Sequence, residues 1–327
     1  MKTFINTADT MLSESLSGFS AAHSDMVMHE EDGNFIRRKT ITKNKVAVIS
    51  GGGSGHEPLH CGFVGTGMLD AACPGYVFTS PTPDQMVKAA LAVEAGSGCI
   101  FIVKNYTGDV MNFDMGAELL PGKARQIVVS DDLATSSGTS GKRGVAGTLI
   151  VQKIIGAAAE RGLLLDQLFA LGTKVNHSTR SMGVALNASY NPMTKRQSFP
   201  LKGTEIEFGI GIHGEPGSAK VNMKSANEIA DDLCAPILAD LKIDANRPAL
   251  LFINGLGATP LGELYLMYHA ARRIFEAAGV KIVRSLVGNY VTSLNMSGCS
   301  ITLTSMSDEM LELWDAPVIT PSLRWGG

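Results

Sequence analysis

The stretch from Val46 to Pro58, VAVISGGGSGHEP, constrains the possible folds more than any other part of the sequence. Its first residues, Val46–Ile49, are apolar and mostly β-branched, which predicts a short buried strand. The strand is expected to stop at Gly51–Gly55, where glycine lets another molecule approach the backbone closely. His56 and Glu57 follow at once. In open α/β sheets ligands bind beyond the carboxyl ends of the strands, so a binding site is expected here rather than a flexible turn with a solvated histidine.

The first half of the chain alternates apolar runs with amphipathic segments. Further strands are expected at residues 99–103 and 126–129, and helices at residues 8–22, 83–93, 112–120, 145–160 and 163–174. Thr82 and Gln85 are spaced as a capping box, with proline at the first helical position. Residues 23–45 are polar and are expected only to connect, and the segment 135–144, rich in Gly and Ser, is expected to be a mobile loop. The alternation predicts a mainly parallel sheet with helices on both faces.

The second half of the chain also alternates expected strands and helices, but less regularly. Strands are expected at residues 182–188, 249–254, 281–287 and 300–304, a hairpin around Gly203, and helices at residues 227–241, 264–278 and 308–314. The segment FGIGIHGEPG, 208–217, again joins an apolar run, glycines, a histidine and a Glu-Pro pair. The fold class predicted is therefore α/β in two domains, residues 1–180 with a mainly parallel sheet and residues 181–327 with a mixed sheet.

Composition and charge exclude several classes of protein. The net charge of −3 argues against a nucleic-acid-binding surface. No uncharged apolar run is long enough for a membrane span, and the N-terminus has no signal-peptide apolar region. The five cysteines are an odd number, widely spaced and without a CxxC pair, which predicts buried thiols in a reducing, cytoplasmic protein.

Three titratable residues lie in or beside glycine segments just after expected strands: His56, Asp109 and His213. Next to His213, Gly214 and the GIGI run provide little side-chain cover, so a ligand could reach the ring. Lys104, at the end of the second strand, could hold a substrate oxygen while Asp109 accepts a proton. A loop cap is the alternative role for Asp109.

Other kinds of site are less well supported. Metal binding is the weaker expectation and no metal is assigned, although His56, Glu57 and His60 in HEPLH have the HExxH spacing. The segment GGGSGHEP lacks the GK[ST] end of a phosphate loop and breaks the GxGxxG pattern of a dinucleotide site. Ser54 does not stand in a GxSxG register, which leaves a hydrolase as a minor alternative.

The sequence resembles a known family, the dihydroxyacetone kinases. The shared motifs, in order, are GGGSGHEP, CPG, FTSPTPDQ, VKNYTGD, KRGVAGT, GAAAERG, FGIGIHGEPG, NGLGATPLGELY and WDAPVITPSLRWG. They cover nearly the whole chain and are specific. The resemblance is to the dihydroxyacetone-binding subunit of the phosphotransferase-dependent enzyme, and it implies a three-layer α/β domain, a mixed α/β domain and a homodimer.

The resemblance also implies roles for individual residues. His213 would add through a ring nitrogen to the carbonyl of dihydroxyacetone and form a hemiaminal. This covalent capture selects carbonyl compounds over polyols such as glycerol. His56 and Asp109 would bind and activate the hydroxyl that is phosphorylated. Lys104 and the backbone of Gly53, Ser54 and Gly55 would hold substrate oxygens.

Partners follow from the same resemblance. The phosphoryl donor would be a nucleotide on a separate subunit, recharged by a third, phosphohistidine-relay subunit, and this chain would carry no cofactor of its own. One departure is that the segment 113–144, with DLATSSGTSG, is shorter than the family leads us to expect. Some relatives bind dihydroxyacetone through the same histidine but act as coactivators of a transcription regulator, which is the alternative function. The kinase is favoured because all its site residues are present.

Overall fold

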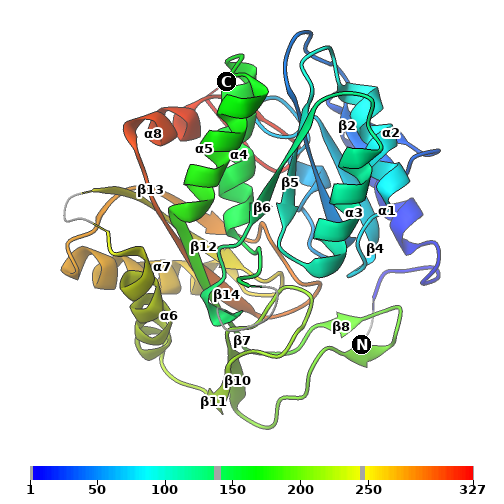
Figure 1. Ribbon diagram of the computed structural model, residues 1–327. Coiled ribbons are helices and arrows are strands. Elements are labelled where there is room, and N and C mark those ends of the chain that lie inside the picture. The colour runs from blue at the N-terminus through cyan, green and yellow to red at the C-terminus, as the bar shows by residue number, and fades with distance from the viewer. Residues whose placement is uncertain (1–2, 136–140, 244–246, 327) are drawn as a thin grey trace. The chain divides into compact units, whose positions relative to one another are not determined.

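A computed structural model describes residues 3–135, 141–243 and 247–326 of the chain (Figure 1). It divides into two compact units, each made of more than one stretch of chain. Unit 1 comprises Met1–Val129, Thr148–Val175 and Met310–Gly327, and unit 2 comprises Ser130–Gly147 and Asn176–Glu309. The expected division, 1–180 and 181–327, was of two continuous stretches, and the structure differs because residues 130–147 and 310–327 each pack with the other half of the sequence.

Unit 1 contains a six-stranded sheet with the order β1-β2-β4-β3-β5-β6. Its strands are β1 (Val27–Glu30), β2 (Phe35–Arg38), β3 (Ala47–Ser54), β4 (Ala71–Val77), β5 (Cys99–Lys104) and β6 (Ala124–Val129). The strands β4, β3, β5 and β6 run parallel, as predicted, whereas β2 pairs antiparallel with β1 and with β4. The expectation that residues 23–45 only connect was therefore wrong, because they form a β-hairpin at the edge of the sheet.

Helices cover both faces of this sheet. They are α1 (Met11–Ala22), α2 (Pro83–Val93), α3 (Thr107–Glu118), α4 (Gly147–Glu160) and α5 (Leu165–His177). The helices α2 and α3 pack on the face that carries Ile49 and Phe101. The helix α4 lies on the opposite face, where Gln152 Nε2 donates to Ser50 Oγ at 3.1 Å. Figure 1 shows α2 and α3 on one side of β5 and β6, and α4 and α5 on the other. The predicted three-layer α/β arrangement is confirmed.

The predicted start of α2 is also confirmed. The helix begins at Pro83, and Gln85 Oε1 accepts a hydrogen bond from the backbone N–H of Thr82 at 3.2 Å. The amide of Gln85 also donates to Pro74 O at 2.9 Å. The same capping residue therefore ties the helix to the end of β4.

Unit 2 contains the second six-stranded sheet, with the order β11-β10-β7-β14-β12-β13. Its strands are β7 (Thr179–Ala185), β10 (Glu205–Phe208), β11 (Ala219–Asn222), β12 (Pro248–Gly255), β13 (Lys281–Gly288) and β14 (Gly298–Ser305). Among the strands described in this second sheet, only β12 and β13 pair in parallel, and the other pairs are antiparallel. A hairpin around Gly203 was the wrong prediction, because β10 pairs with β11 and with β7. Thus the segment 209–218, which contains His213, connects β10 to β11.

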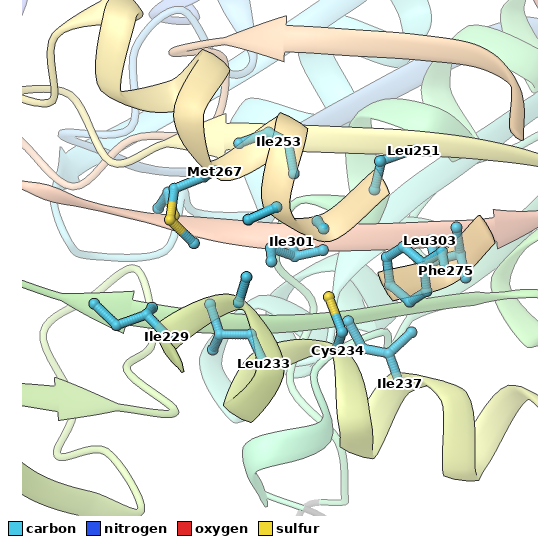
Figure 2. Packing of buried hydrophobic residues seen from close by; sticks show 14 of the residues in the cluster. Ile229, Leu233, Cys234, Ile237, Leu251, Ile253, Met267, Phe275, Ile301 and Leu303 are labelled. Carbon is cyan, nitrogen blue, oxygen red and sulfur yellow. The ribbon is translucent and has the colours of Figure 1, made fainter. Parts of the chain in front are cut away.

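Two helices, α6 (Ala226–Leu241) and α7 (Leu261–Ala277), cover one face of the second sheet. Figure 2 shows their apolar side chains meeting those of β12 and β14; the labelled residues are Ile229, Leu233, Cys234, Ile237, Leu251, Ile253, Met267, Phe275, Ile301 and Leu303. The remaining elements are α8 (Asp308–Asp315) and two small ribbons, β8 (Tyr190–Asn191) with β9 (Arg196–Gln197) and β15 (Val318–Ile319) with β16 (Arg324–Trp325). Of the expected loop 135–144, residues 136–140 lie outside the described part of the chain.

A buried ionic cluster holds the parallel strands of unit 1 at their amino ends. The carboxylate of Asp70 accepts from Arg38 Nη1 at 3.0 Å, from Lys45 Nζ at 2.5 Å and from the backbone N–H of Val48 at 2.8 Å. Glu160 also pairs with Arg38, at 2.5 Å. Burial lowers the pKa of Arg38, but the carboxylates of Asp70 and Glu160 outweigh it and leave that pKa raised. The two cations of the cluster are therefore stabilised by its two carboxylates, and the removal of one charge leaves its partners without a counter-charge.

We expect Asp70→Asn to reduce the free energy of unfolding by about 3–5 kcal/mol, because it leaves buried cations without their main counter-charge. The matched control is Asp166→Asn, which breaks an exposed pair with Arg125 at 2.8 Å and is expected to cost at most about 1 kcal/mol. Urea unfolding of both variants, followed by circular dichroism, measures the difference. Equal losses in the two variants would contradict the assignment of Asp70 as the centre of the cluster.

Candidate active site

The strand β3 does not end where the sequence predicted but continues through the glycines to Ser54. Residues 51–53 pair with residues 73–75 of β4. At position 52 a Cβ atom would lie 2.2 Å from Lys104 Nζ and would displace the ammonium group, and the φ of 157° is one that other residues rarely adopt. The hydroxyl of Ser54 donates to Gly75 O at 2.6 Å, so this side chain joins β3 to β4. The chain leaves the strand at Gly55, with a φ of 100° that other residues rarely adopt.

Lys104 is the last residue of β5, and its side chain is fully buried. Three polar atoms lie around its ammonium group: Gly51 O, which accepts a hydrogen bond at 3.3 Å, His60 Nε2 at 3.0 Å and Asp109 Oδ2, an ion-pair partner at 3.6 Å. Burial lowers the pKa of Lys104, and the carboxylate of Asp109 opposes that shift. The structure thus brings Lys104 and Asp109 together, as their positions in the sequence suggested.

Asp109 lies in the first turn of α3, which begins at Thr107, five residues earlier than expected. It is therefore a helical residue, and the alternative of a loop cap was wrong. The hydroxyl of Ser80 donates to Asp109 Oδ1. Among the described residues no group donates a hydrogen bond to Oδ2, although the residue is only 3 % exposed. One carboxylate oxygen is thus fixed and the other can accept a proton.

His56 is fully buried, and its ring stacks on that of Phe78 with centroids 5.2 Å apart and planes inclined by 27°. Phe78 has a φ of 55°, in the left-handed region that aromatic residues rarely occupy. The chain around Phe78 folds back over Gly53, where a Cβ atom would lie 2.6 Å from Thr79 N. The strained turn therefore places an aromatic wall beside His56, a type of strain that often marks functional sites.

In unit 2 the segment after β10 holds His213 against Glu215. The carboxylate of Glu215 accepts from the backbone N–H of His213 at 3.1 Å and faces His213 Nδ1 at 3.4 Å. A Cβ atom at Gly211 would lie 2.2 Å from Glu215 Oε2, so a larger residue there would displace this carboxylate. Burial raises the pKa of Glu215, but the hydrogen bond and charge of His213, with the charge of Arg143, leave the pKa below its usual value. An ionised Glu215 facing Nδ1 favours the tautomer that carries the ring proton on Nδ1.

Arg143 and two isoleucines anchor this segment. The guanidinium of Arg143 pairs with Asp132 at 2.7 Å and donates to Gly209 O at 2.7 Å. Burial raises the pKa of Asp132 to about 6 despite the charge of Arg143. Ile210 and Ile212 are buried, and Ile210 packs with an apolar cluster of unit 2. The histidine is thus carried on a segment fixed on both sides.

Several residues of these two groups were not predicted from the sequence. His60 follows His56 by four positions in GHEPLH, and Ser80 stands in FTSPTPDQ, so both had a motif that could have drawn attention to them. For Gln152 and Arg143, the indications of a role in a site were weaker in the sequence. In the described part of the chain, no three His, Cys, Asp or Glu side chains are placed to hold a metal ion. None of the helices described is long and apolar enough to cross a membrane.

Comparison with known proteins gives a consistent result. The Dak1 domain matches residues 17–322. The PEP-dependent dihydroxyacetone kinase subunit DhaK of Escherichia coli is 42% identical, with 100% of each chain covered. Among solved structures, the dihydroxyacetone kinase operon co-activator DhaQ has a TM-score of 0.88 at 35% identity and covers 93% of this chain and 96% of its own. The dihydroxyacetone kinase of C. freundii has a TM-score of 0.89 at 32% identity, covering 99% of this chain and 60% of its own. The chain belongs to the Dak1 domain family, the dihydroxyacetone kinase family that its motifs resembled.

Proposed function

We propose that this chain is the dihydroxyacetone-binding subunit of a phosphotransferase-dependent dihydroxyacetone kinase. The observation that carries the proposal is the end-to-end similarity to the Escherichia coli subunit of that name, at 42% identity. The two groups of side chains described above support it, because one suits capture of a carbonyl and the other suits activation of a hydroxyl.

Capture is assigned to His213. Its Nε2 lone pair attacks the carbonyl carbon of dihydroxyacetone, and the carbonyl π electrons move to oxygen, which gains a proton. The ring loses the Nδ1 proton in the same overall step, so the product is a neutral hemiaminal. Glu215, facing Nδ1 at 3.4 Å, stabilises the positive charge that develops on the ring.

Activation of the hydroxyl is assigned to unit 1. Attack on phosphorus needs a hydroxyl group placed in line and a group that takes its proton. Asp109 Oδ2 is the proton acceptor, since Oδ1 is held by Ser80. His56 is assigned to the same hydrogen-bonding set, and Lys104, with the backbone of Gly53–Gly55, holds substrate oxygens.

The phosphoryl donor is proposed to be a nucleotide on a partner subunit, recharged by a phosphohistidine-relay subunit. The isolated chain is expected not to bind ATP in the micromolar range, because GGGSGHEP lacks the lysine and Ser/Thr of a phosphate loop. Isothermal titration calorimetry of the isolated chain tests this. Micromolar binding of ATP would show that the donor site is on this chain. A homodimer, expected from the resemblance, and a cytoplasmic location, expected from the cysteine pattern, belong to the same proposal.

A coactivator is the second candidate function, because the co-activator DhaQ is similar over 93% of this chain. The two candidates differ in one reaction. With the donor and relay subunits and phosphoenolpyruvate added, a kinase subunit produces dihydroxyacetone phosphate, whereas a coactivator binds dihydroxyacetone without turnover. We expect product, because Asp109, Lys104, His56 and His213 are all present. Binding without product would favour the coactivator and a transcription regulator as partner.

A further inference from the structure

A second histidine of unit 1, His60, lies behind the proposed substrate-binding groups and has no role in the mechanism above. Its side chain is buried, and the residue is 5 % exposed. Its Nε2 lies 3.0 Å from Lys104 Nζ, and its Nδ1 lies 3.0 Å from Ser50 Oγ and 2.7 Å from the carboxamide of Gln152. His60 therefore links the buried ammonium group to polar side chains of β3 and α4.

The hydrogen bonds around Lys104 determine which ring nitrogen of His60 carries a proton. An ammonium group has three N–H donors and no acceptor. Two of those donors face Gly51 O at 3.3 Å and His60 Nε2 at 3.0 Å, whereas Asp109 Oδ2, at 3.6 Å, is an ion-pair neighbour beyond hydrogen-bond distance. If Nε2 carried a proton, two donors would face each other at 3.0 Å in a buried site. The lone pair of Nε2 must therefore face the ammonium, which places the single ring proton on Nδ1.

The Nδ1 proton has acceptors within reach. The hydroxyl of Ser50 donates to Ile102 O at 2.6 Å, so its oxygen lone pairs can accept from the ring at 3.0 Å. As placed, Gln152 Nε2 faces the ring at 2.7 Å, and Oε1 has no hydrogen-bond partner among the described residues. Exchanging O and N of this amide gives up the Nε2 bond to Ser50 Oγ and turns Oε1 toward the ring as a second acceptor. Both partners are fully buried. The contacts with Ser50 and Gln152 thus stabilise the Nδ1–H tautomer of His60, and this tautomer has its lone pair on Nε2.

We propose that His60 is a positioning residue for Lys104: as a neutral Nδ1–H imidazole it accepts a hydrogen bond from the ammonium and directs it between Gly51 O and Asp109. Burial, followed by the charges of Lys104 and His56, holds the pKa of His60 well below its usual value, in agreement with a neutral ring. The charged or titratable groups around the pair are Lys104, Asp109 and His56. The structural part of the proposal is independent of the proposed function, and only its kinetic part depends on it.

The first experiment examines the ring in the wild-type protein without substrate. Long-range ¹H–¹⁵N NMR of ¹⁵N-histidine-labelled protein distinguishes the two neutral tautomers and the imidazolium form. We expect the His60 signals to show a protonated Nδ1 and an unprotonated Nε2 throughout pH 5.5–8.5, a range about the ordinary histidine pKa of roughly 6.5. A protonated Nε2, or an imidazolium that forms near pH 6.5, would overturn the proposal whether or not the chain is a kinase subunit. The His60→Gln spectrum assigns the signals.

The second experiment compares two substitutions in the complete assay with donor and relay subunits. The carboxamide oxygen that His60→Gln introduces can replace the Nε2 acceptor, whereas His60→Leu removes it. We expect His60→Leu to reduce kcat/KM by about 10²-fold, since a displaced positioning group can cost that much, and His60→Gln to retain activity within about 10-fold of wild type. His269→Leu, on the exposed side of α7, controls for the loss of a histidine.

A pH profile separates positioning from a purely structural role. Without its acceptor, the ammonium of Lys104 is less stable, so the alkaline limb of kcat/KM in His60→Leu is expected to move to lower pH, while that of His60→Gln stays near wild type. Equal profiles for His60→Leu and wild type, with equal kcat/KM, would overturn the proposal. If His60→Leu does not fold, the wild-type tautomer and the His60→Gln profile still decide it.

Discussion

His213→Ala is expected to abolish the covalent adduct with dihydroxyacetone and to reduce turnover in the complete assay by at least about 10²-fold. Alanine has no nucleophile, so the substrate would be held only by hydrogen bonds, which discriminate poorly between a ketone and its polyol analogues. Intact-protein mass spectrometry after incubation with dihydroxyacetone, followed by peptide mapping, locates the adduct. In wild type we expect it on the peptide that contains His213.

Two further variants make this test specific. His177→Ala, at the end of α5, removes a histidine outside the proposed site and is expected to keep the adduct. Glu215→Gln keeps the shape of the turn but removes the charge that faces Nδ1 at 3.4 Å, so adduct formation is expected to weaken without being lost. An adduct that persists in His213→Ala would refute the assignment of this residue as the nucleophile.

Asp109→Asn is expected to reduce turnover by about 10²–10⁴-fold while leaving the His213 adduct and KM little changed, because the carboxamide has similar shape but does not accept the proton in the transition state. The structure sharpens this expectation. Oδ1 is committed to Ser80 and Oδ2 has no hydrogen-bond donor among the described residues, so the carboxylate has one oxygen for the substrate. Steady-state kinetics with donor and relay subunits measures the effect.

The matched control is Asp114→Asn, which changes an exposed carboxylate on the same helix and is expected to leave turnover unchanged. His56→Asn is assayed in parallel. If Asp109→Asn retains full turnover and His56→Asn loses it, His56 is the base. If neither the wild type nor any variant gives product, the coactivator is the better assignment.

Much of the fold followed from apolar runs. The strands β5, β6, β12, β13 and β14 were predicted within a few residues, since each contains a short run of apolar or β-branched residues. The end of β3 was not. Glycine is usually unfavourable in strands, but here residues 51–53 pair with β4 and lie so close to Lys104 and Cys73 that a larger residue would not fit. Such contacts are made by residues distant in sequence, and a local pattern does not report them.

The strand β4 was missed for a related reason. Its sequence, AACPGYV, contains proline, which is typical of edge strands. The partner strand β2 pairs only with residues 71 and 72, so Pro74 has β3 on one side and no ladder on the other. Its carbonyl oxygen accepts from Gln85 Nε2 at 2.9 Å instead. Proline lacks a backbone N–H group, and at this position no neighbouring strand needs one as a hydrogen-bond donor.

The candidate site was predicted in part. The placement of His56, Lys104 and Asp109 in unit 1, and of His213 in unit 2, followed from glycines and polar groups after strands, and their roles stay predictions. His60 could not be assigned, because its importance comes from Gln152, 92 residues away in the sequence, and from Lys104, 44 residues away. Glu215 is part of the motif HGEPG in the sequence. Only the structure shows that its carboxylate faces the imidazole ring of His213.

The composition of unit 1 from three separate stretches has a consequence for biosynthesis. Residues 310–327 belong to the same compact unit as residues 1–129 and 148–175, and Lys153 of α4 donates to Leu313 O at 2.8 Å within that unit. At a translation rate of about 5–20 residues per second, the ribosome needs roughly 7–27 s to pass from residue 175 to residue 310. During that interval the part of unit 1 that carries Lys104 on β5 and Asp109 on α3 lacks its last segment. Unit 1 is thus completed only after the whole of unit 2 has been synthesised.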